Sequence, residues 1–339
     1  MRDTVVILHQ EVGHEAPADE LDVLDQVECV ERELRDMGYR VRTLPFDLDL
    51  RNLARRIHKL HPALAFNLVE TVMGDGRLAP LVCSFLDHLG IPYTGSGAQA
   101  MLLTTNKTMA KRWMGPWGIP TPEWFEPGRP SEGAPPFPAT YILKPVWEDA
   151  SVGIEAGCVI EAEETSALVK ALHDLERSIH KPCFAERFID GREFNLALLA
   201  CGDSVEVLPV CEIVFDLPEG MPRIVGYRAK WAEESVEFKG TVRVTDFPGE
   251  DSALLERLRR TALACWDLFD LRGYARVDMR VDREGRPFVL EINANPCISP
   301  DSGFCAAASK AGLAFRDIVE RIVQAAARPP VQGRLEPCR

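Results

Sequence analysis

Several features that mark common protein classes are missing from this sequence. No apolar run approaches the length of a membrane-spanning helix, and the formal net charge of −13 leaves no general excess of basic residues. The ten cysteines form no C-x-x-C pair and no zinc-type cluster with histidine, and there is no G-x-x-x-x-G-K-S/T phosphate loop. These absences argue against membrane insertion, broad nucleic-acid binding, a structural zinc site and a P-loop nucleotide site.

The N-terminus and the cysteines both indicate a cytoplasmic protein. Residues 1–8 are too short and too acidic for a signal peptide, and their apolar end predicts a first strand. Without an export signal, the thiols are expected to stay reduced. Cys83 and Cys265 lie among apolar residues, which favours small core side chains over reactive groups.

Length and periodicity predict a multidomain protein that combines α/β and α+β architecture. Over residues 1–97, strand and helix patterns alternate, which is typical of a parallel sheet with covering helices. Residues 98–190 and 191–326 are expected to form two α+β units, with 327–339 as a flexible tail. A polar stretch at 216–239 is long for a structureless loop and is predicted to be a functional lid. The main expected elements are strands at 5–8, 39–44, 63–68, 141–144, 183–187 and 193–199, and helices at 22–37, 50–59, 78–89, 107–118, 165–178, 252–269 and 302–325.

Two alternating segments near the C-terminus, joined by a polar turn, predict a hairpin with charged residues on one face. Side chains two apart on a strand share a face, so Arg276 lies beside Asp278, and Glu291 beside Asn293. If the strands pair, the carboxylates suit Mg²⁺ and the guanidinium suits a phosphate or an oxyanion. The alternative is a solvated face with an ordinary ion pair, which fits poorly because neighbours such as Val277 are apolar.

Two lysines and a turn of small residues are candidates for phosphate binding. Lys107 begins a predicted helix, and Lys144 ends an apolar strand, where an ammonium group could meet a phosphate. Either lysine alone is more often a solvated surface residue. The turn at 149–154, which includes Ser151, has backbone N–H groups that could cover phosphates, although most such turns only reverse the chain.

Three more features have both a functional and a plain structural interpretation. Glu186 and Glu193 flank a turn, where carboxylates could take ribose hydroxyls or simply face water. Lys230 lies in the predicted lid, where a cation could close over a triphosphate. Ser302 opens the last helical segment, where it could be an N-cap or bind a carboxylate.

Taken in order, these features resemble the ATP-grasp superfamily and, within it, the D-alanine–D-alanine ligases. The likeness runs from about residue 65 to residue 320, and the order and spacing of its motifs are more specific than any one of them. The motifs are Lys107, Lys144-Pro145, Ser151-Val152-Gly153, the segment 186–193, Lys230, Arg276-x-Asp278 and Glu291-x-Asn293, with further matches at 74–76, 90–97, 118–122 and 293–302.

The resemblance implies an ATP-grasp fold, in which two α+β units hold ATP between antiparallel sheets. It also implies ATP and two Mg²⁺ ions, or Mn²⁺ in their place, as cofactors. The residues that it assigns are Lys107, Lys144 and Lys230 for phosphates, Glu186, Phe188, Ile189 and Glu193 for adenine and ribose, Asp278, Glu291 and Asn293 for the metal, and Arg276, Lys230 and Ser151 for catalysis.

The positions for the amino substrate depart from those of the D-alanine ligases. The family's Gly-Gly-x-Ser-x-Glu type motif is absent after the first strand, and Asp19 or Glu20 lies nearer the matching glutamate. Gly74 replaces an expected glutamate, with Glu70 nearby, and Trp231 replaces a tyrosine. A substrate other than D-alanine is therefore expected. The predicted substrate contacts are Glu20, Glu70, Trp231 and Ser302.

We therefore expect an ATP-dependent carboxylate–amine ligase that forms an amide or peptide bond through an acyl phosphate. Its substrates would be small and amino-acid-like, in a specialised pathway, with no nucleic-acid or membrane partner. D-alanine–D-alanine ligation in cell-wall synthesis is one alternative, and an intramolecular cyclase is another. A regulatory module that binds ATP without turnover is an alternative of a different class. By resemblance, a homodimer is expected.

Overall fold

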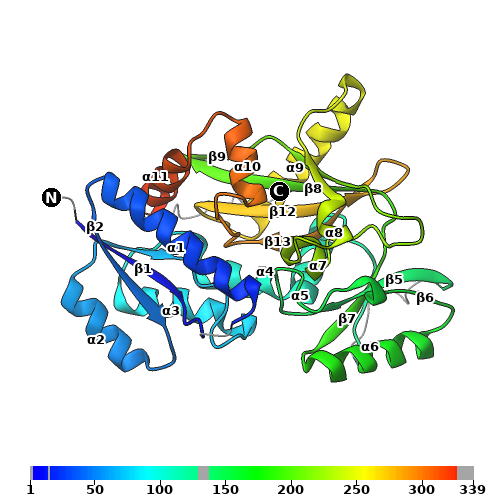
Figure 1. Ribbon diagram of the computed structural model, residues 1–339, viewed down its shortest axis with the longest axis horizontal. Helices are drawn as coiled ribbons and strands as arrows, with labels where there is room; N and C mark the ends of the chain where they lie inside the picture. The colour runs from blue at the N-terminus through cyan, green and yellow to red at the C-terminus, as the bar shows by residue number, and fades with distance from the viewer. Residues whose placement is uncertain (1–2, 14–15, 129–136, 327–339) are drawn as a thin grey trace, which may run out of the picture.

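Three β-sheets organise the chain. Its structure, a computed structural model, describes residues 3–13, 16–128 and 137–326. Figure 1 shows the sheet of the N-terminal strands at one end, a second sheet at the opposite end, and the third sheet above and between them. The mixture of one parallel and two antiparallel sheets agrees with the expected α/β and α+β class.

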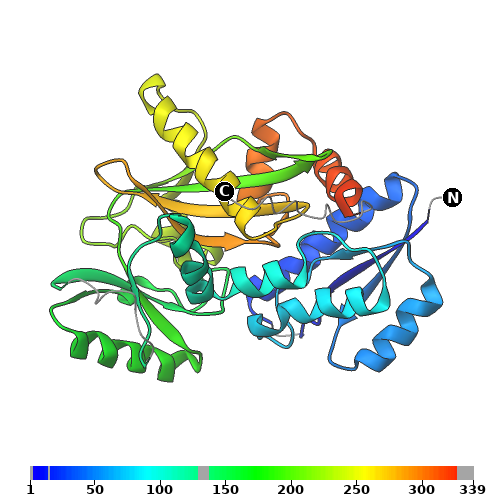
Figure 2. The ribbon, with the colours of Figure 1, turned by 180° about the vertical axis from the view of Figure 1, so that it is seen from behind.

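The first sheet is parallel and is covered on both faces. Side chains alternate along the central strand β1, so Val5 and Ile7 pack toward α1 while Val6 and Leu8 pack toward α2 and α3. Figure 2 shows the cyan α3 on the face of this sheet that is turned away from α1. The sheet order is β2 (Arg40–Phe46), β1 (Thr4–Gln10) and β3 (Leu64–Asn67), and the helices are α1 (Ala18–Asp36), α2 (Leu50–Leu60) and α3 (Ala79–Leu89).

The second sheet is antiparallel and has one helix against it. Apolar residues of α6 (Thr165–Ile179), such as Leu168 and Leu172, pack on Tyr141 and Leu143 of the central strand. The outer face of α6 is polar, so this unit has a thin core. The sheet order is β4 (Trp124–Phe125), β7 (Cys183–Arg187), β5 (Ala139–Pro145) and β6 (Val159–Ala162).

The third sheet carries the predicted hairpin, and alternation on it decides where the charges lie. Odd-numbered residues of β12, such as Val277 and Met279, are buried with α9 and α4 (Ala98–Thr105). Even-numbered residues therefore occupy the opposite face, which α10 and α11 cover only at the Tyr274 end. The strands are β11 (Thr241–Val244), β10 (Cys211–Phe215), β8 (Arg192–Cys201), β12 (Tyr274–Val281), β13 (Pro287–Asn293) and β9 (Ser204–Val207), and the helices are α9 (Ser252–Leu268), α10 (Gly303–Lys310) and α11 (Phe315–Ala326).

Two stretches differ from the sequence-based expectation. The helix predicted at 107–118 is α5 (Lys107–Met114), and an unpredicted helix, α4 (Ala98–Thr105), precedes it. Asn106 separates them, because its extended backbone ends α4 while its side chain accepts a hydrogen bond from Met109 N, 2.8 Å away, and so caps α5.

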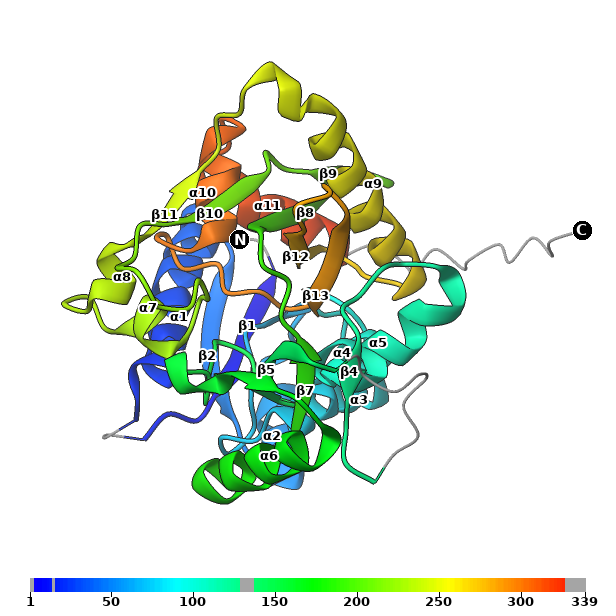
Figure 3. The ribbon, with the colours of Figure 1, turned by 90° about the vertical axis from the view of Figure 1, so that its right-hand side faces the viewer.

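The predicted lid at 216–239 is not structureless. It contains two short helices, α7 (Tyr227–Trp231) and α8 (Val236–Lys239). Figures 1 and 3 both show α7 near the start of α1 and near the second sheet, so the lid lies where the three sheets approach one another. This position gives the lid contacts with both halves of the site described below.

Apolar cores run across the predicted domain ranges. One core joins α1 and β1 to α10 and α11, and another joins α4 and α5 to α9 and β12. The predicted boundaries at 97 and 190 therefore do not separate the apolar cores, and the division into domains remains a prediction. The predicted tail at 327–339 lies outside the described residues. Within the described part of the chain, no helix is both long enough and apolar enough to span a membrane.

Candidate active site

The hairpin of β12 and β13 brings its four polar residues together, as the alternation predicts. Arg276 pairs in register with Asn293, and Asp278 pairs with Glu291, because a bulge after Asp278 resets the register. Two nitrogens of Arg276 each donate to Asp278 at 2.8 Å, and the amide nitrogen of Asn293 lies 3.4 Å from Asp278. We refer to Arg276, Asp278, Glu291 and Asn293 as the hairpin cluster.

Electrostatics in the hairpin cluster keep its charges in place. Burial opposes ionisation of Glu291, but Lys107, Lys230 and Arg276 together lower its pKa well below the usual range. Burial raises the pKa of Asp278, although Arg276 opposes the shift. Asp278 also accepts a hydrogen bond from Asn195 Nδ2 at 2.8 Å, which fixes its orientation.

Lys107 connects the hairpin cluster to the small-residue turn. It is the first residue of α5 and only 3% exposed. Its Nζ donates to the carbonyl of Glu148 at 2.7 Å and to Asp149 at 2.9 Å, and it lies 3.3 Å from Glu291. Burial alone disfavours the charge, but Asp149 and Glu291 outweigh it and raise the pKa of Lys107. A buried, charged lysine thus faces both the turn and the hairpin.

Glu186 lies between two lysines. Lys144 Nζ donates to it at 2.6 Å, and Lys111 Nζ contacts its other oxygen. Burial disfavours its charge, yet Lys111 and Lys144 lower the pKa of Glu186. Glu186, predicted to contact ribose or adenine, is therefore the anion shared by two buried lysines, Lys111 and Lys144. Lys111 was missed, although it follows Lys107 by four residues and so lies on the same helical face.

Three of the four predicted adenine and ribose residues, Phe188, Ile189 and Glu193, contact one arginine that sequence reasoning missed. Arg280 donates to Glu193 at 2.9 Å and to the carbonyl of Ile189 at 2.8 Å. Its guanidinium carbon lies 4.8 Å from the ring centroid of Phe188. Period-two alternation from Arg276 could have found Arg280, because both lie on one face of β12.

Side chains of the lid meet the small-residue turn. Trp231 Nε1 donates to the carbonyl of Ala150 at 3.1 Å, and Ser151 Oγ donates to the carbonyl of Val225 at 2.7 Å. Burial, and then the charge of Arg276, lower the pKa of Lys230, while Glu291 opposes the shift. The lid therefore contacts the turn through Val225 and Trp231, which precede and follow Lys230 in the sequence. The charges of Arg276 and Glu291, in the hairpin cluster, act on Lys230.

A cavity of about 380 Å³ lies beneath the lid. Residues of the N-terminal unit, of the segments that flank the second sheet, and of the lid line it. We call it the lid cavity. Its wall includes both acidic residues predicted to bind substrate, Glu20 and Glu70. Burial raises the pKa of Glu70 to about 7, against a hydrogen bond from Gln26 at 3.1 Å. Position 74 has no side chain, and a Cβ there would be in ordinary contact with the Glu20 carboxylate, at 3.6 Å. The lining residues are Gln10, Pro17, Asp19, Glu20, Glu70, Thr71, Gly74, Gly76, Trp147, Glu148, Asp149, Ala150, Val152, Gly153, Glu155, Lys181 and Tyr227.

Ser302 is an N-cap. Its hydroxyl accepts a hydrogen bond from Cys305 N at 3.2 Å at the start of α10, which is the structural role that sequence analysis weighed against carboxylate binding. It does not line the lid cavity. Contact with a substrate carboxylate remains a prediction.

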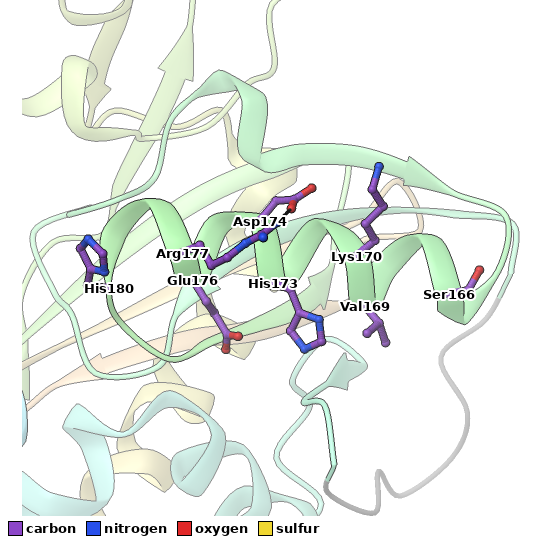
Figure 4. Close-up of a pocket in the computed structure, with 8 residues that line it drawn as sticks. All are labelled: Ser166, Val169, Lys170, His173, Asp174, Glu176, Arg177 and His180. Atoms are coloured by element: carbon purple, nitrogen blue, oxygen red, sulfur yellow. Dashed lines mark hydrogen bonds and ion pairs between the residues drawn. The ribbon is translucent and has the colours of Figure 1, made fainter.

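A larger hollow, of about 820 Å³, lies on the outside of α6 (Figure 4). Residues from Ser166 to His180 on this one helix line it, and Figure 4 shows their side chains projecting from a single helical surface. It is an open face that contains none of the predicted site residues. The lid cavity is smaller but adjoins the charged groups, so it is the better candidate for substrate binding.

The donor set of the hairpin cluster suits a hard cation. Two carboxylates and one amide match the oxygen ligands that Mg²⁺ takes, with phosphate oxygens completing its shell. Asn293 currently directs its nitrogen at Asp278, so it would have to present its oxygen to a cation instead. Lys107 and Lys144 supply cations for phosphates nearby. The arrangement thus fits a metal–nucleotide complex.

Comparisons with known proteins agree with this geometry. The family model described as "D-ala D-ala ligase C-terminus" matches residues 132–324. A D-alanine–D-alanine ligase of Synechococcus is 32% identical over 298 residues, which cover 86% of this chain and 85% of that protein. An uncharacterized protein of Sinorhizobium fredii, y4sG, is 34% identical over 266 residues, covering 78% and 75%.

Solved structures show the same fold. The D-alanine–D-alanine ligase of Bacillus anthracis complexed with ATP superposes with a TM-score of 0.72 at 19% identity, covering 96% of this chain and 97% of that one. D-alanyl-alanine synthetase A of Vibrio cholerae gives 0.71 at 15% identity, covering 96% and 99%. At such identities the likeness establishes the architecture alone.

Proposed function

Because the chain belongs to the D-alanine–D-alanine ligase family, and is therefore an ATP-dependent ligase that forms C–N bonds, we propose that it joins the carboxylate of one amino-acid-like substrate to the amine of another. A carboxylate oxygen of the first substrate attacks the γ-phosphorus of ATP, and ADP leaves. The amine nitrogen of the second substrate then attacks the acyl carbon, and phosphate leaves as the amine loses a proton.

The side chains act by positioning and by neutralising charge. Lys107, Lys144 and Lys230 hold phosphate oxygens, while the guanidinium of Arg276 stabilises the negative charge that develops at the acyl centre. Asp278, Glu291 and Asn293 would hold Mg²⁺, which neutralises phosphate charge when bound. Phe188, Ile189, Glu193 and Glu186 form the nucleotide side. No covalent nucleophile from the protein is needed.

The observation that carries the proposal is the convergence of charge at the hairpin cluster. Its two carboxylates lie between Arg276 and Lys107, with Lys107 Nζ 3.3 Å from Glu291 and Arg276 Nη2 2.8 Å from Asp278. A module that only binds nucleotide does not need the Arg276 guanidinium beside the carboxylates proposed to hold the metal. This argument favours catalysis over a regulatory ATP-binding role.

We further propose that the product is not D-alanyl-D-alanine but a dipeptide or amide of a specialised pathway. The altered amino-substrate positions support this: Trp231 donates a hydrogen bond from the lid to Ala150 in the turn, and Gly74, in place of an expected glutamate, lies beside Glu20. The rival, D-alanine–D-alanine ligation, has its support in the names of the relatives.

The test is ADP release from the purified chain with ATP, Mg²⁺ and pairs of D- and L-amino acids, with product mass measured for each active pair. We expect stimulated ADP release and a linear amide product. Efficient D-Ala-D-Ala formation would overturn the specialised substrate, and a mass lower by one water from a single substrate would identify a cyclase. ADP release that no pairing stimulates would favour the regulatory module.

A further inference from the structure

The lid cavity contains far more negative than positive charge. Six carboxylates line it, from Asp19, Glu20, Glu70, Glu148, Asp149 and Glu155. Among the described residues in its wall, Lys181 is the only cation. Lys181 pairs with Glu148 at 2.7 Å, and Lys107 pairs with Asp149 at 2.9 Å from outside the wall. The other four carboxylates have no cationic partner among the described residues.

Two of these four carboxylates have neutral hydrogen-bond donors as partners. Asp19 accepts a hydrogen bond from the hydroxyl of Tyr227 at 2.8 Å, and Glu70 accepts one from the amide of Gln26 at 3.1 Å, so neutral donors satisfy them only in part. Burial and the neighbouring charges of Asp22 and Asp149 raise the pKa of Glu70 to about 7. A cationic ligand group would reverse that effect.

A second and independent feature indicates an organic ligand. Gln10 lines the cavity and is only 3% exposed, and its Oε1 accepts the backbone N–H of Glu70 at 3.2 Å. That bond fixes which end of the amide is nitrogen, and no described residue accepts a hydrogen bond from this nitrogen. An oriented N–H donor in a cavity wall is available to an acceptor there, such as a carboxylate or carbonyl oxygen of a ligand.

A metal ion is a poor candidate for the missing positive charge. In the described residues, no group of three or more histidines, cysteines, aspartates or glutamates is arranged to hold a metal. The acids are instead spread over the walls of the cavity, from α1, the segment after β3, and the turn after β5. Separated carboxylates suit ammonium groups at the two ends of an extended molecule.

We propose that the substrate of the lid cavity is a dibasic amino acid, with an ammonium group on its side chain as well as its α-ammonium. The inference rests on the proposed ligase function and names the substrate class for the same site. One ammonium group, as in alanine, leaves most of the unpaired carboxylates without a partner. Two ammonium groups can pair with two of the four unpaired acids, and a carboxylate can accept from the Gln10 donor.

The test compares lysine and ornithine with norleucine and norvaline, which keep the carbon chains and lack the terminal amine. Each is offered as D- and L-enantiomer to the full chain with ATP and Mg²⁺, with and without a second amino acid, and ADP release is followed. We expect kcat/KM at least about tenfold higher for the dibasic compounds, the effect of one charge-assisted contact. Binding of lysine and norleucine without ATP is measured by calorimetry.

Substitutions test whether the lid cavity causes the preference for lysine over norleucine. Glu20→Gln with Glu70→Gln should reduce the lysine-to-norleucine ratio at least about tenfold, whereas Glu256→Gln on the exposed face of α9 should leave it unchanged. Norleucine used as well as lysine, or turnover of small neutral amino acids alone, would overturn the dibasic substrate and leave the ligase proposal intact. No ADP release with any pair, together with no binding of lysine, would overturn both.

Discussion

The hairpin cluster and the lid cavity are neighbouring regions that differ in charge balance. In the hairpin cluster, Asp278 has Arg276 at 2.8 Å and Glu291 has Lys107 at 3.3 Å, so each acid already has a cation. In the described wall of the lid cavity, six carboxylates share one lining ammonium group. The first region is nearly neutral before any ligand arrives, and the second needs a ligand to become so. We infer that the first fixes the reaction and the second chooses the substrate.

The largest effect is expected from Glu291→Gln, which tests the catalytic half of this comparison. Loss of the charge removes a proposed metal ligand and the partner of Lys107. Several kcal/mol of transition-state stabilisation correspond to a fall in kcat on the order of 10³-fold. Stopped-time ADP assays over a range of Mg²⁺ concentrations measure it. Glu284→Gln, in the exposed turn of the same hairpin, is the control and should keep full activity.

Next in size is the loss of stability expected for Glu186→Gln. The change leaves the ammonium groups of Lys111 and Lys144 buried without their shared anion. Breaking a buried ion pair on one side costs about 3–5 kcal/mol, which urea unfolding would report as a lower midpoint. Glu161→Gln, exposed on β6, provides the comparison. An unchanged midpoint would mean that Glu186 serves the nucleotide and not the fold.

A smaller effect, in pH dependence, tests the excess of acid in the lid cavity. Because the pKa of Glu70 in the folded chain is about 7, above its usual 4.5, the folded state binds the extra proton between these values. Stability should therefore fall as pH rises from about 5 to 8, by at most about 3 kcal/mol from this group. In Glu70→Gln, the difference in Tm between pH 5 and pH 8 should shrink. An identical pH profile in both proteins would contradict the unpaired state of Glu70.

The smallest effect is expected at the lid, which joins the two regions. Trp231→Phe removes the indole hydrogen bond to Ala150 and keeps an aromatic ring. One such bond contributes about 0.5–1.5 kcal/mol, so KM for the amino substrate should rise about two- to tenfold with little change in kcat. Trp117→Phe alters a tryptophan that is 69% exposed and far from the lid contacts. Equal kinetics for both variants would mean that the lid contact is irrelevant to binding.

Local patterns were enough to predict the hairpin cluster. Period-two alternation placed Arg276 beside Asp278 and Glu291 beside Asn293, and strand pairing with one bulge brought them opposite each other. The N-cap role of Ser302 also follows from its position before a helix. These features depend on residues close in sequence, whose geometry the backbone sets.

Contacts between distant segments could not be predicted in the same way. Arg280 meets residues 189 and 193, Lys111 meets Glu186, and Tyr227 meets Asp19 more than two hundred positions away. The helix at 98–105 was missed, and the only helix predicted in this stretch begins at Lys107, after Asn106. No periodicity in one segment specifies which other segment will cover it.

The sequence by itself determined the parallel first sheet, the faces of β12 and the presence of a charged hairpin, because alternation and capping act over a few residues. Only the tertiary structure decided which charges are neutralised. Ion pairing depends on side chains brought within about 4 Å of one another from separate elements, and packing sets that distance. For this reason Glu186 pairs with two lysines, while Glu20 and Glu70 pair with none of the lysines that the structure describes.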